Sequence, residues 1–304
     1  MSVWFITFHG GKYPCKTPSS PGGSYTGNIN TLGGLILSGP LPQMEELRGS
    51  AVDSSGNLYI ANANKSLSQI LQFQPTKYGT YASSSTTPWA TADLAHPFAL
   101  QFDSAGNLYA VNQDPAPKAN SPVVAWYDSN GNSKGTFIPS TTAPTPGPAL
   151  IEPRGLAWDG NSTWYLADEK GNSDGSGKKG TGAVYIYDNS GNYTNAISVN
   201  DPVHLQYAQT YLFIGSNSAN TVYCYTPSSQ KVTQLLPSNP GVTIKAVSGL
   251  AIPGDGYIYV NSRETFQVMQ FQLNLSTTPP SASNGVIFFD QLPDYPEFIR
   301  LLDV

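Results

Sequence analysis

A strand-turn-strand pattern that recurs along the chain constrains the fold more than any other feature of the sequence. It reads SAVDSSGNLYIAN at residues 50–62 and LQFDSAGNLYAVN at residues 100–112, and related copies begin at residues 153, 202 and 247. Each copy has an alternating apolar segment, a turn rich in Gly, Asn and Asp, and a second alternating segment. This is the pattern of a β-hairpin.

A third alternating segment follows every hairpin, and a second turn leads to a fourth segment. GAVYIYD at residues 182–188 is such a third segment, and DNSGN at residues 188–192 is such a second turn. The repeating unit is therefore a four-stranded antiparallel meander. The equivalent first-strand positions lie 45 to 56 residues apart and are Arg48, Phe98, Arg154, Val203, Ser248 and Glu297. A period of this length with four strands predicts a β-propeller.

The six repeats that begin at these first-strand positions account for the whole chain. We therefore predict an all-β, six-bladed propeller that forms a single domain over residues 1–304. The last blade is split, because its first strand is C-terminal and residues 2–39 supply its other three strands. Residues 297–303 should pair beside residues 3–8 and close the ring, which leaves no edge strand unpaired. The predicted blades span about residues 48–90, 97–140, 153–199, 202–238, 247–290, and 295–304 together with 1–39.

The acidic and amide residues of the repeated turn could bind calcium instead of shaping a hairpin. Gly56 and Asn57, like Gly106 and Asn107, supply the positions tolerant of positive φ that a hairpin turn needs. A calcium loop needs spaced carboxylates and a closing bidentate Glu, and the repeat has neither. We therefore predict that the turn is structural.

Composition excludes several classes of partner. Charged residues make up 12% of the chain, and the formal net charge of −5 is spread without runs of either sign. No basic stripe is present for a nucleic acid and no polybasic segment for a membrane surface. The longest apolar runs, such as VWFITF at residues 3–8, are far shorter than a membrane span. We expect a soluble monomer that binds neither nucleic acid nor membrane.

The cellular compartment is only weakly indicated. Met1 leads directly into an alternating apolar segment with no signal peptide, but a mature secreted form would look the same. We slightly favour an extracellular mature form over a cytoplasmic one. Cys15 and Cys224 lie in different repeats, so the sequence allows a disulfide between them without favouring it.

The repeat resembles known propeller blades. The pattern P-x-G-L-x-x-D-x-x-G-N-L-Y-x-x-N is similar to the blades of NHL-repeat propellers and of the gluconolactonase/senescence-marker and strictosidine-synthase-like propellers. The resemblance covers all six repeats. It implies the fold and a ligand face, but this fold hosts lactonases, lyases, condensing enzymes and binding scaffolds, so it implies no single activity.

Polar residues concentrate at one rim of the predicted propeller. In a meander the first strand starts where the second strand ends, so first-strand starts and the loops after second strands share a rim. Three of these loops are long: residues 9–24, 113–121 and 169–181. The polar residues placed there are His9, Glu46, Arg48, Asn62, His96, Asn112, Glu152, Arg154, Asp168, Asp201, His204, Asn261, Tyr295 and Glu297. A wet channel mouth or structural ion pairs would also explain them.

The resemblance argues against a catalytic metal. The gluconolactonase family places Asn and Asp ligands where this chain has Arg48, Phe98, Arg154, Val203 and Ser248, and only Glu297 keeps an oxygen ligand there. We therefore expect neither a metal nor another cofactor. Guanidinium groups in these places suit carboxylate, enolate or phosphate oxygens instead.

Three functions stay open at this rim. The first is binding of a small anionic or oxygen-rich organic ligand, with Arg48, Arg154, His9, Asp168, Asn112 and Tyr295 as the ligand-binding residues. The second is a metal-independent lyase, isomerase or cyclase, with His96, His204 and Glu297 as catalytic acids or bases. The third is a scaffold that engages a protein or glycan through the long loops.

Overall fold

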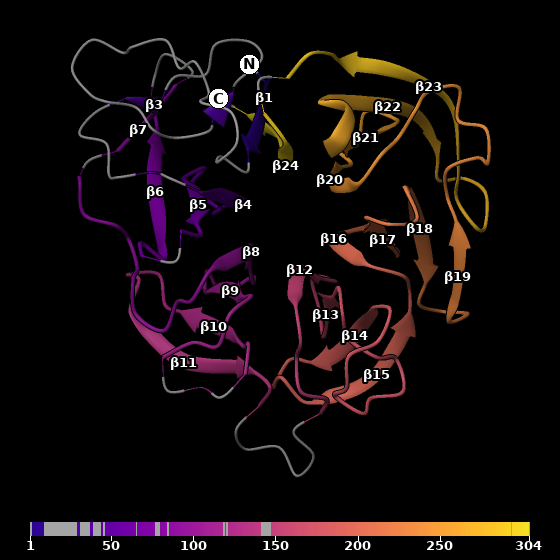
Figure 1. Ribbon diagram of the computed structural model, residues 1–304. Coiled ribbons are helices and arrows are strands. Elements are labelled where there is room, and N and C mark those ends of the chain that lie inside the picture. The colour runs from indigo at the N-terminus through magenta and orange to yellow at the C-terminus, as the bar shows by residue number, and fades with distance from the viewer. Residues whose placement is uncertain are drawn as a thin grey trace. The chain divides into compact units, whose positions relative to one another are not determined.

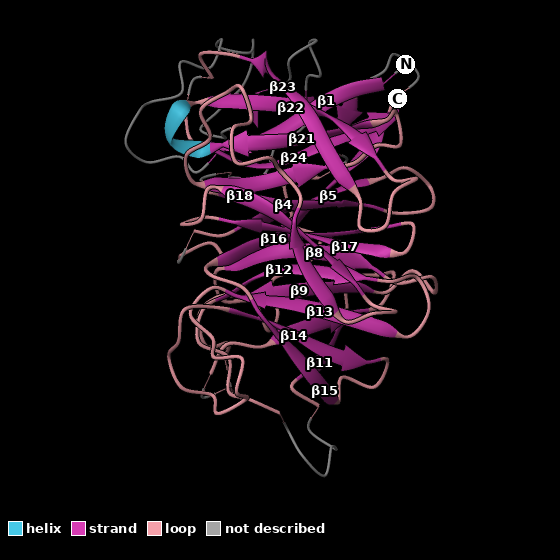
Figure 2. Ribbon diagram, turned by 90° about the vertical axis from the view of Figure 1, so that its right-hand side faces the viewer, coloured by secondary structure: helices cyan, strands magenta, loops and turns pink. Residues whose placement is uncertain are grey.

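The computed structural model describes residues 2–8, 29–30, 37–38, 44, 46–64, 66–76, 80–83, 85–117, 119, 121–140, 147–292 and 294–303. The elements in these ranges are strands, joined by loops and one helical turn, η1 (Arg263–Thr265), which is cyan in Figure 2. The chain forms two compact units, Met1–Thr136 with Pro293–Val304, and Phe137–Leu292. Within the described residues no helix is long and apolar enough to cross a membrane.

The first unit contains three sheets. One has the strand order β3-β7-β6-β5-β4, one the order β11-β10-β9-β8, and one the order β2-β1-β24. Their bounds are β1 (Ser2–Phe8), β2 (Ile29–Asn30), β3 (Leu37–Ser38), β4 (Leu47–Val52), β5 (Leu58–Asn62), β6 (Gln69–Pro75), β7 (Tyr81–Ala82), β8 (Pro97–Phe102), β9 (Leu108–Asn112), β10 (Val124–Tyr127), β11 (Ser133–Ile138) and β24 (Pro296–Asp303). β11 runs across the boundary into the second unit.

The second unit consists of three four-stranded sheets, each in chain order, β12 to β15, β16 to β19 and β20 to β23 (Figure 1). Their bounds are β12 (Pro153–Trp158), β13 (Thr163–Asp168), β14 (Ala183–Asp188), β15 (Tyr193–Ser198), β16 (Pro202–Ala208), β17 (Tyr211–Ser216), β18 (Thr221–Thr226), β19 (Lys231–Gln234), β20 (Val247–Ala251), β21 (Tyr257–Ser262), β22 (Gln267–Asn274) and β23 (Ser281–Phe289). All neighbouring strands in these sheets are antiparallel.

The prediction of six four-stranded blades was wrong for the described residues, which form five. The sixth sheet, β2-β1-β24, has three strands. Residues 33–39 were predicted to be the outer strand of this blade. They contain β3, which pairs in parallel with β7 of the first blade, with Leu37 opposite Tyr81. β7 is only two residues long and would otherwise be an open edge, and this edge accepts β3.

The two ends of the chain meet in the three-stranded sheet as the sequence predicted. β1 and β24 are antiparallel, with Ser2 opposite Asp303, Ile6 opposite Ile299, and a register shift at Thr7 and Phe8. The buried hydroxyl of Thr7 accepts a hydrogen bond from the N–H of Phe298, 3.2 Å away. Closure of a ring through this pair stays a prediction.

Burial decreases from the first strands of a blade to its outer strand. β5 and β9 are buried along their whole length, which is why LYIAN and LYAVN are nearly continuous apolar runs. The outer strands β15 and β19 are mostly exposed or half-buried. The core lies between successive blades: Tyr59 and Ala61 of one blade pack in a single cluster with Leu100 of the next. Area removed from water between blades is the main stabilising contribution.

The repeated Asp-Ser-x-Gly-Asn turn is held together by its own carboxylate. Asp53 Oδ1 accepts the backbone N–H groups of Ser55 and Asn57, each at 2.9 Å. Its Oδ2 accepts the Asn57 amide at 2.8 Å and the Tyr59 hydroxyl at 3.1 Å. Asp103 repeats all of these contacts in the next blade. Both oxygens of each Asp are thus engaged within the hairpin.

Replacement of Gly106 by Ala tests the turn. Gly106 has φ of +81° and an added Cβ would meet no atom within 4 Å, so the only penalty is the left-handed backbone. We expect Gly106→Ala to lower the free energy of unfolding by about 1 kcal/mol, measured by urea denaturation. Gly191→Ala is the control, because its Cβ would lie 2.1 Å from the Phe137 carbonyl oxygen, and it should cost more. An unchanged Gly106→Ala midpoint would contradict the turn assignment.

Candidate functional site

A backbone hydrogen bond repeated in all five blades joins the end of the second strand to the entry of the first. The residue after the second strand donates its N–H to the carbonyl of the residue before the first strand. The pairs are Ala63 to Glu46 (2.7 Å), Gln113 to His96 (3.2 Å), Glu169 to Glu152 (3.0 Å), Asn217 to Asp201 (2.9 Å) and Arg263 to Ala246 (3.1 Å). First-strand starts and second-strand ends therefore lie together in each blade.

The side chain of the last residue of the second strand also hydrogen-bonds to the backbone just before the first strand. Asn112 Oδ1 accepts the Ala95 N–H at 2.9 Å, and its Nδ2 donates to the Asp93 carbonyl at 2.9 Å. Asp168 accepts the N–H groups of Ile151 and Glu152, each at 2.8 Å. Asn112 and Asp168 have no exposed surface. The contacts of these two predicted ligand-binding residues are thus with the backbone of their own blade.

In the fifth blade the sequence alignment of this position was wrong by one residue. Ser262, rather than Asn261, lies opposite Val247 at the start of the first strand. Its Oγ accepts the Lys245 N–H at 2.9 Å, as the Asn and Asp side chains do in other blades. A serine at this position gives no clear signal in the sequence, whereas the adjacent asparagine does.

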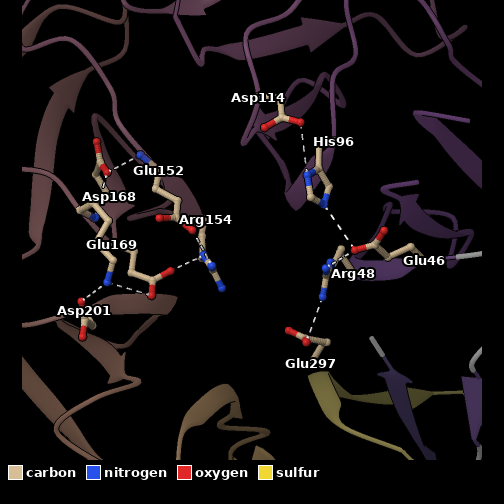
Figure 3. Close-up of polar contacts among 11 residues, drawn as sticks. Glu46, Arg48, His96, Asp114, Glu152, Arg154, Asp168, Glu169, Asp201 and Glu297 are labelled. Carbon is tan, nitrogen blue, oxygen red and sulfur yellow. Dashed lines mark hydrogen bonds and ion pairs between the residues drawn. The ribbon is translucent and has the colours of Figure 1, made fainter. Parts of the chain in front are cut away.

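In the first unit an ion-pair network surrounds Arg48 (Figure 3). Its Nη1 lies 2.9 Å from Glu297 Oε1, and its Nη2 donates to Glu46 Oε1. The guanidinium also lies over the Phe98 ring, 5.0 Å from the centroid. The side chains of Arg48 and Glu297 are each 4% exposed. Because the pair is buried, removal of either partner would leave an uncompensated charge inside the protein.

His96 extends this network toward solvent. Its Nε2 lies 3.4 Å from Glu46 Oε1, and its Nδ1 lies 3.5 Å from Asp114 Oδ2. The backbone of His96 has φ of +52°, and its N–H donates to Ser68 Oγ at 2.9 Å. The exposed fraction of the side chain rises from 14% at His96 to 42% at Asp114. A residue of the long loop after β9 thus completes a chain of groups that begins at a buried arginine.

In the second unit Arg154 has a comparable setting (Figure 3). Its Nη2 lies 2.7 Å from Glu152 Oε1, and its Nε lies 2.5 Å from Glu169 Oε2. Lys170 continues the network, with Nζ 3.3 Å from Glu169 Oε1 and 2.6 Å from Asp201 Oδ1. Arg154 is more exposed than Arg48, at 21%. Each predicted arginine is therefore paired with two carboxylates of its own unit.

Burial and pairing shift the acidity of this second network. Burial raises the pKa of Asp168 and of Glu169. Burial alone would raise the pKa of Asp201, but the hydrogen bond from Lys170 brings it below its usual range. Burial alone would lower the pKa of Lys170, but its contacts with Asp201 and Glu169 raise it.

The other predicted catalytic and ligand-binding residues are His204, Tyr295 and His9. His204 is 8% exposed on β16. Tyr295 is half-buried before β24, and its N–H donates to Asp294 Oδ1 at 2.7 Å. His9 and Cys15 lie outside the described residues, and the thiol of Cys224 is free and buried. Among the residues that the structure describes, no three His, Cys, Asp or Glu side chains gather to hold a metal.

Sequence reasoning missed three residues of the networks, Asp114, Glu169 and Lys170. Each follows the end of a second strand by one or two residues. This spacing was a usable signal, because the hydrogen bond after the second strand places these residues beside the first-strand entry.

Comparisons with known proteins identify the fold of this chain but do not assign it to a family. No family model and no curated protein matches the sequence. A chain in the crystal structure of a nidogen/laminin complex matches with a TM-score of 0.64 and 12% identity, over 99% of this chain and 98% of that one. Virginiamycin B lyase from Staphylococcus aureus matches with a TM-score of 0.52 and 14% identity, over 83% of this chain and 73% of that one. The likeness confirms a β-propeller of four-stranded antiparallel blades.

Replacement of either arginine by methionine should lower stability in proportion to burial. Arg48→Met leaves the carboxylates of Glu46 and Glu297 without their shared cation, so we expect a loss of about 3 kcal/mol or more in the free energy of unfolding. Arg154→Met is the matched variant at a more exposed pair and should cost about 1 kcal/mol. Urea denaturation measures both. Equal losses of stability in the two variants would contradict the prediction that the loss follows the burial of the arginine.

The buried Asp168 should make stability depend on pH. Its pKa is raised on folding, so above about pH 4, where the unfolded carboxyl ionises, the folded protein loses stability until the pH passes the folded pKa. The free energy of unfolding of the wild type minus that of Asp168→Asn should therefore be larger at pH 4 than at pH 7.

Asp188→Asn is the control of opposite sign. Burial opposes ionisation of Asp188, but its hydrogen bonds with Asn192 and Ser190 lower its pKa overall. Its contribution is therefore present above about pH 4 and lost below it. The wild type should exceed Asp188→Asn by more at pH 7 than at about pH 3. If the stability difference between wild type and variant changed with pH in the same direction for Asp168→Asn and Asp188→Asn, the opposite pKa shifts of the two residues would be contradicted.

Proposed function

We propose that the protein is a binding module that takes up an uncharged, hydroxyl-rich small molecule at the Arg48 network. Charged and polar side chains form a continuous path here, from Arg48 through Glu46 and His96 to Asp114, and the proposal rests on this path. A hydroxyl group both donates and accepts hydrogen bonds, so a polyol can pair with carboxylates and imidazole that alternate along one path.

Charge favours a neutral ligand over the anionic one that the arginines first suggested. The network contains one guanidinium and three carboxylates, those of Glu46, Asp114 and Glu297. Arg48 is already paired with two of these carboxylates, so an anion would have to displace a buried partner. Oxygen-rich but uncharged molecules avoid that cost, because the repulsion between like charges is absent.

The test compares a sugar with its own acid. Binding raises apparent stability by mass action, so xylitol or glucose should raise the melting temperature of the protein, and gluconate at the same concentration should not. Asp114→Asn should weaken the effect at least about threefold, the scale of one hydrogen bond to a charged group. Asp174→Asn, an exposed loop carboxylate of the second unit, should leave it unchanged. Stronger binding of gluconate, or no response to neutral polyols, would contradict the proposal.

A second candidate is a metal-independent lyase, isomerase or cyclase at the same network. The position of His96 between two carboxylates favours it, because such pairing can orient an imidazole for proton transfer. The fold shared with virginiamycin B lyase is consistent with this activity. His96→Gln should then abolish turnover of a bound polyol derivative and weaken its binding only by the scale of one hydrogen bond. A partner-binding scaffold, consistent with the nidogen/laminin neighbour, would instead leave all small polyols unbound.

A further inference from the structure

The second unit contains a pocket of about 310 Å³, and none of the residues that line it belongs to an ion pair among the described residues. It lies among the turn between β17 and β18, the start of β18, the end of β19, and residues 236–244, which lead to β20. The residues that line it are Ala219, Asn220, Thr221, Gln234, Leu236, Pro237, Ser238, Pro240, Val242, Thr243 and Ile244. Its volume is at the lower end of the range for small-molecule sites.

No ionisable side chain lines this pocket. Leu236, Val242, Ile244 and the two prolines supply hydrocarbon surface, and the polar side chains are hydroxyls and amides. A charged ligand would lose its hydration here without meeting an opposite charge. The lining has no charge and more polar than apolar surface, so it suits an uncharged molecule that combines hydrogen-bonding groups with a small aliphatic part.

A buried hydroxyl at this pocket lacks a partner. Thr221 is 6% exposed, and its Oγ1 has no hydrogen bond within the described residues. Buried polar groups in folded proteins are nearly always paired with protein, water or ligand. An acceptor on a molecule in the pocket would satisfy this donor.

The walls of the pocket are fixed by contacts that do not depend on a ligand. Asn220 Oδ1 accepts the Ala246 N–H at 2.7 Å, which ties the turn to the start of β20. Gln234 Nε2 donates to the Leu236 carbonyl at 2.9 Å. Pro240 packs so closely on β23 that a Cβ at Gly285 would lie 2.3 Å from its carbonyl oxygen. The pocket is thus preformed, which reduces the entropic cost of binding.

The segment that forms one wall also carries unused backbone donors. Within the part of the chain that the structure describes, none of the N–H groups of residues 236–244 donates to another group. These amides can bind acceptors of a ligand or water. They add backbone hydrogen-bonding groups to the side-chain hydroxyls and amides of the lining.

We propose that this pocket binds an uncharged small molecule in which an aliphatic ring or chain carries a carbonyl or other hydrogen-bond acceptor. The hydrocarbon part packs on Leu236, Val242 and Ile244, and the acceptor takes the hydrogen bond of Thr221 Oγ1. This site is independent of the Arg48 network, which belongs to the other unit.

The test is a titration with three probes of similar size, followed by the methyl NMR signals of Val242 and Ile244. N-acetylpiperidine is uncharged and has a carbonyl, cyclohexanecarboxylate is an anion, and N-methylpiperidinium is a cation. We expect saturable shifts of both methyl signals with N-acetylpiperidine and at least tenfold weaker binding of the charged probes. The methyl signals of Ile197 and Val199, in the blade formed by β12 to β15, should not move.

Variants of β18 separate binding from folding. Thr221→Val keeps the shape and removes the unpaired hydroxyl, so it should weaken N-acetylpiperidine at least threefold without lowering the melting temperature of the free protein. Thr226→Val, at the other end of β18 and outside the pocket, should leave the affinity unchanged. Equal affinity for charged probes, no saturable shift at Ile244, or an unchanged affinity in Thr221→Val would each overturn the proposal.

Discussion

The hydrogen bond that joins the end of the second strand to the segment before the first strand is the contact on which the polar end of each blade depends. It recurs in all five blades, for example from Gln113 to the carbonyl of His96 and from Glu169 to that of Glu152. Because it brings both chain segments to one end of the blade, polar residues before a first strand can lie beside polar residues after a second strand, as His96 does beside Gln113 and Glu152 beside Glu169. Buried Asn, Asp or Ser side chains accept backbone N–H groups at the same junction.

Charge neutralisation limits the ligands that each arginine network could accept. An isolated arginine at a channel mouth would attract anions, but Arg48 and Arg154 each lie between two carboxylates. Burial of the Arg48 pair favours keeping it intact, since separating it would leave an unpaired charge in a region of low dielectric constant. In the proposed site, the more exposed side chains of His96 and Asp114 are the groups that would exchange hydrogen bonds with a ligand.

The two proposed sites differ in the way they select a ligand. The Arg48 network is rich in carboxylates and suits hydroxyl groups, whereas the pocket lined by Thr221, Val242 and Ile244 has no ionisable group and suits hydrocarbon with one acceptor. Both are built where a loop returns to a first strand. This is the part of the blade where side chains vary without disturbing the ladder, because the hairpin register is set at the opposite end by turns such as that of Asp53.

The sequence by itself determined the hairpins, the meander and the rim on which polar residues gather. These features rest on alternation along a strand and on hydrogen bonds that span only a few residues, such as those of Asp53 to Asn57 and Tyr59. The tertiary structure alone decided the number of four-stranded blades, because β3 pairs with an edge far from it in sequence and a two-residue strand carries too little pattern to reveal its partner. It also decided the charge of the site and the existence of the pocket. Which carboxylate neutralises Arg48, and whether Thr221 is left unpaired, depend on how loops from separate strands pack together, and no local spacing encodes that.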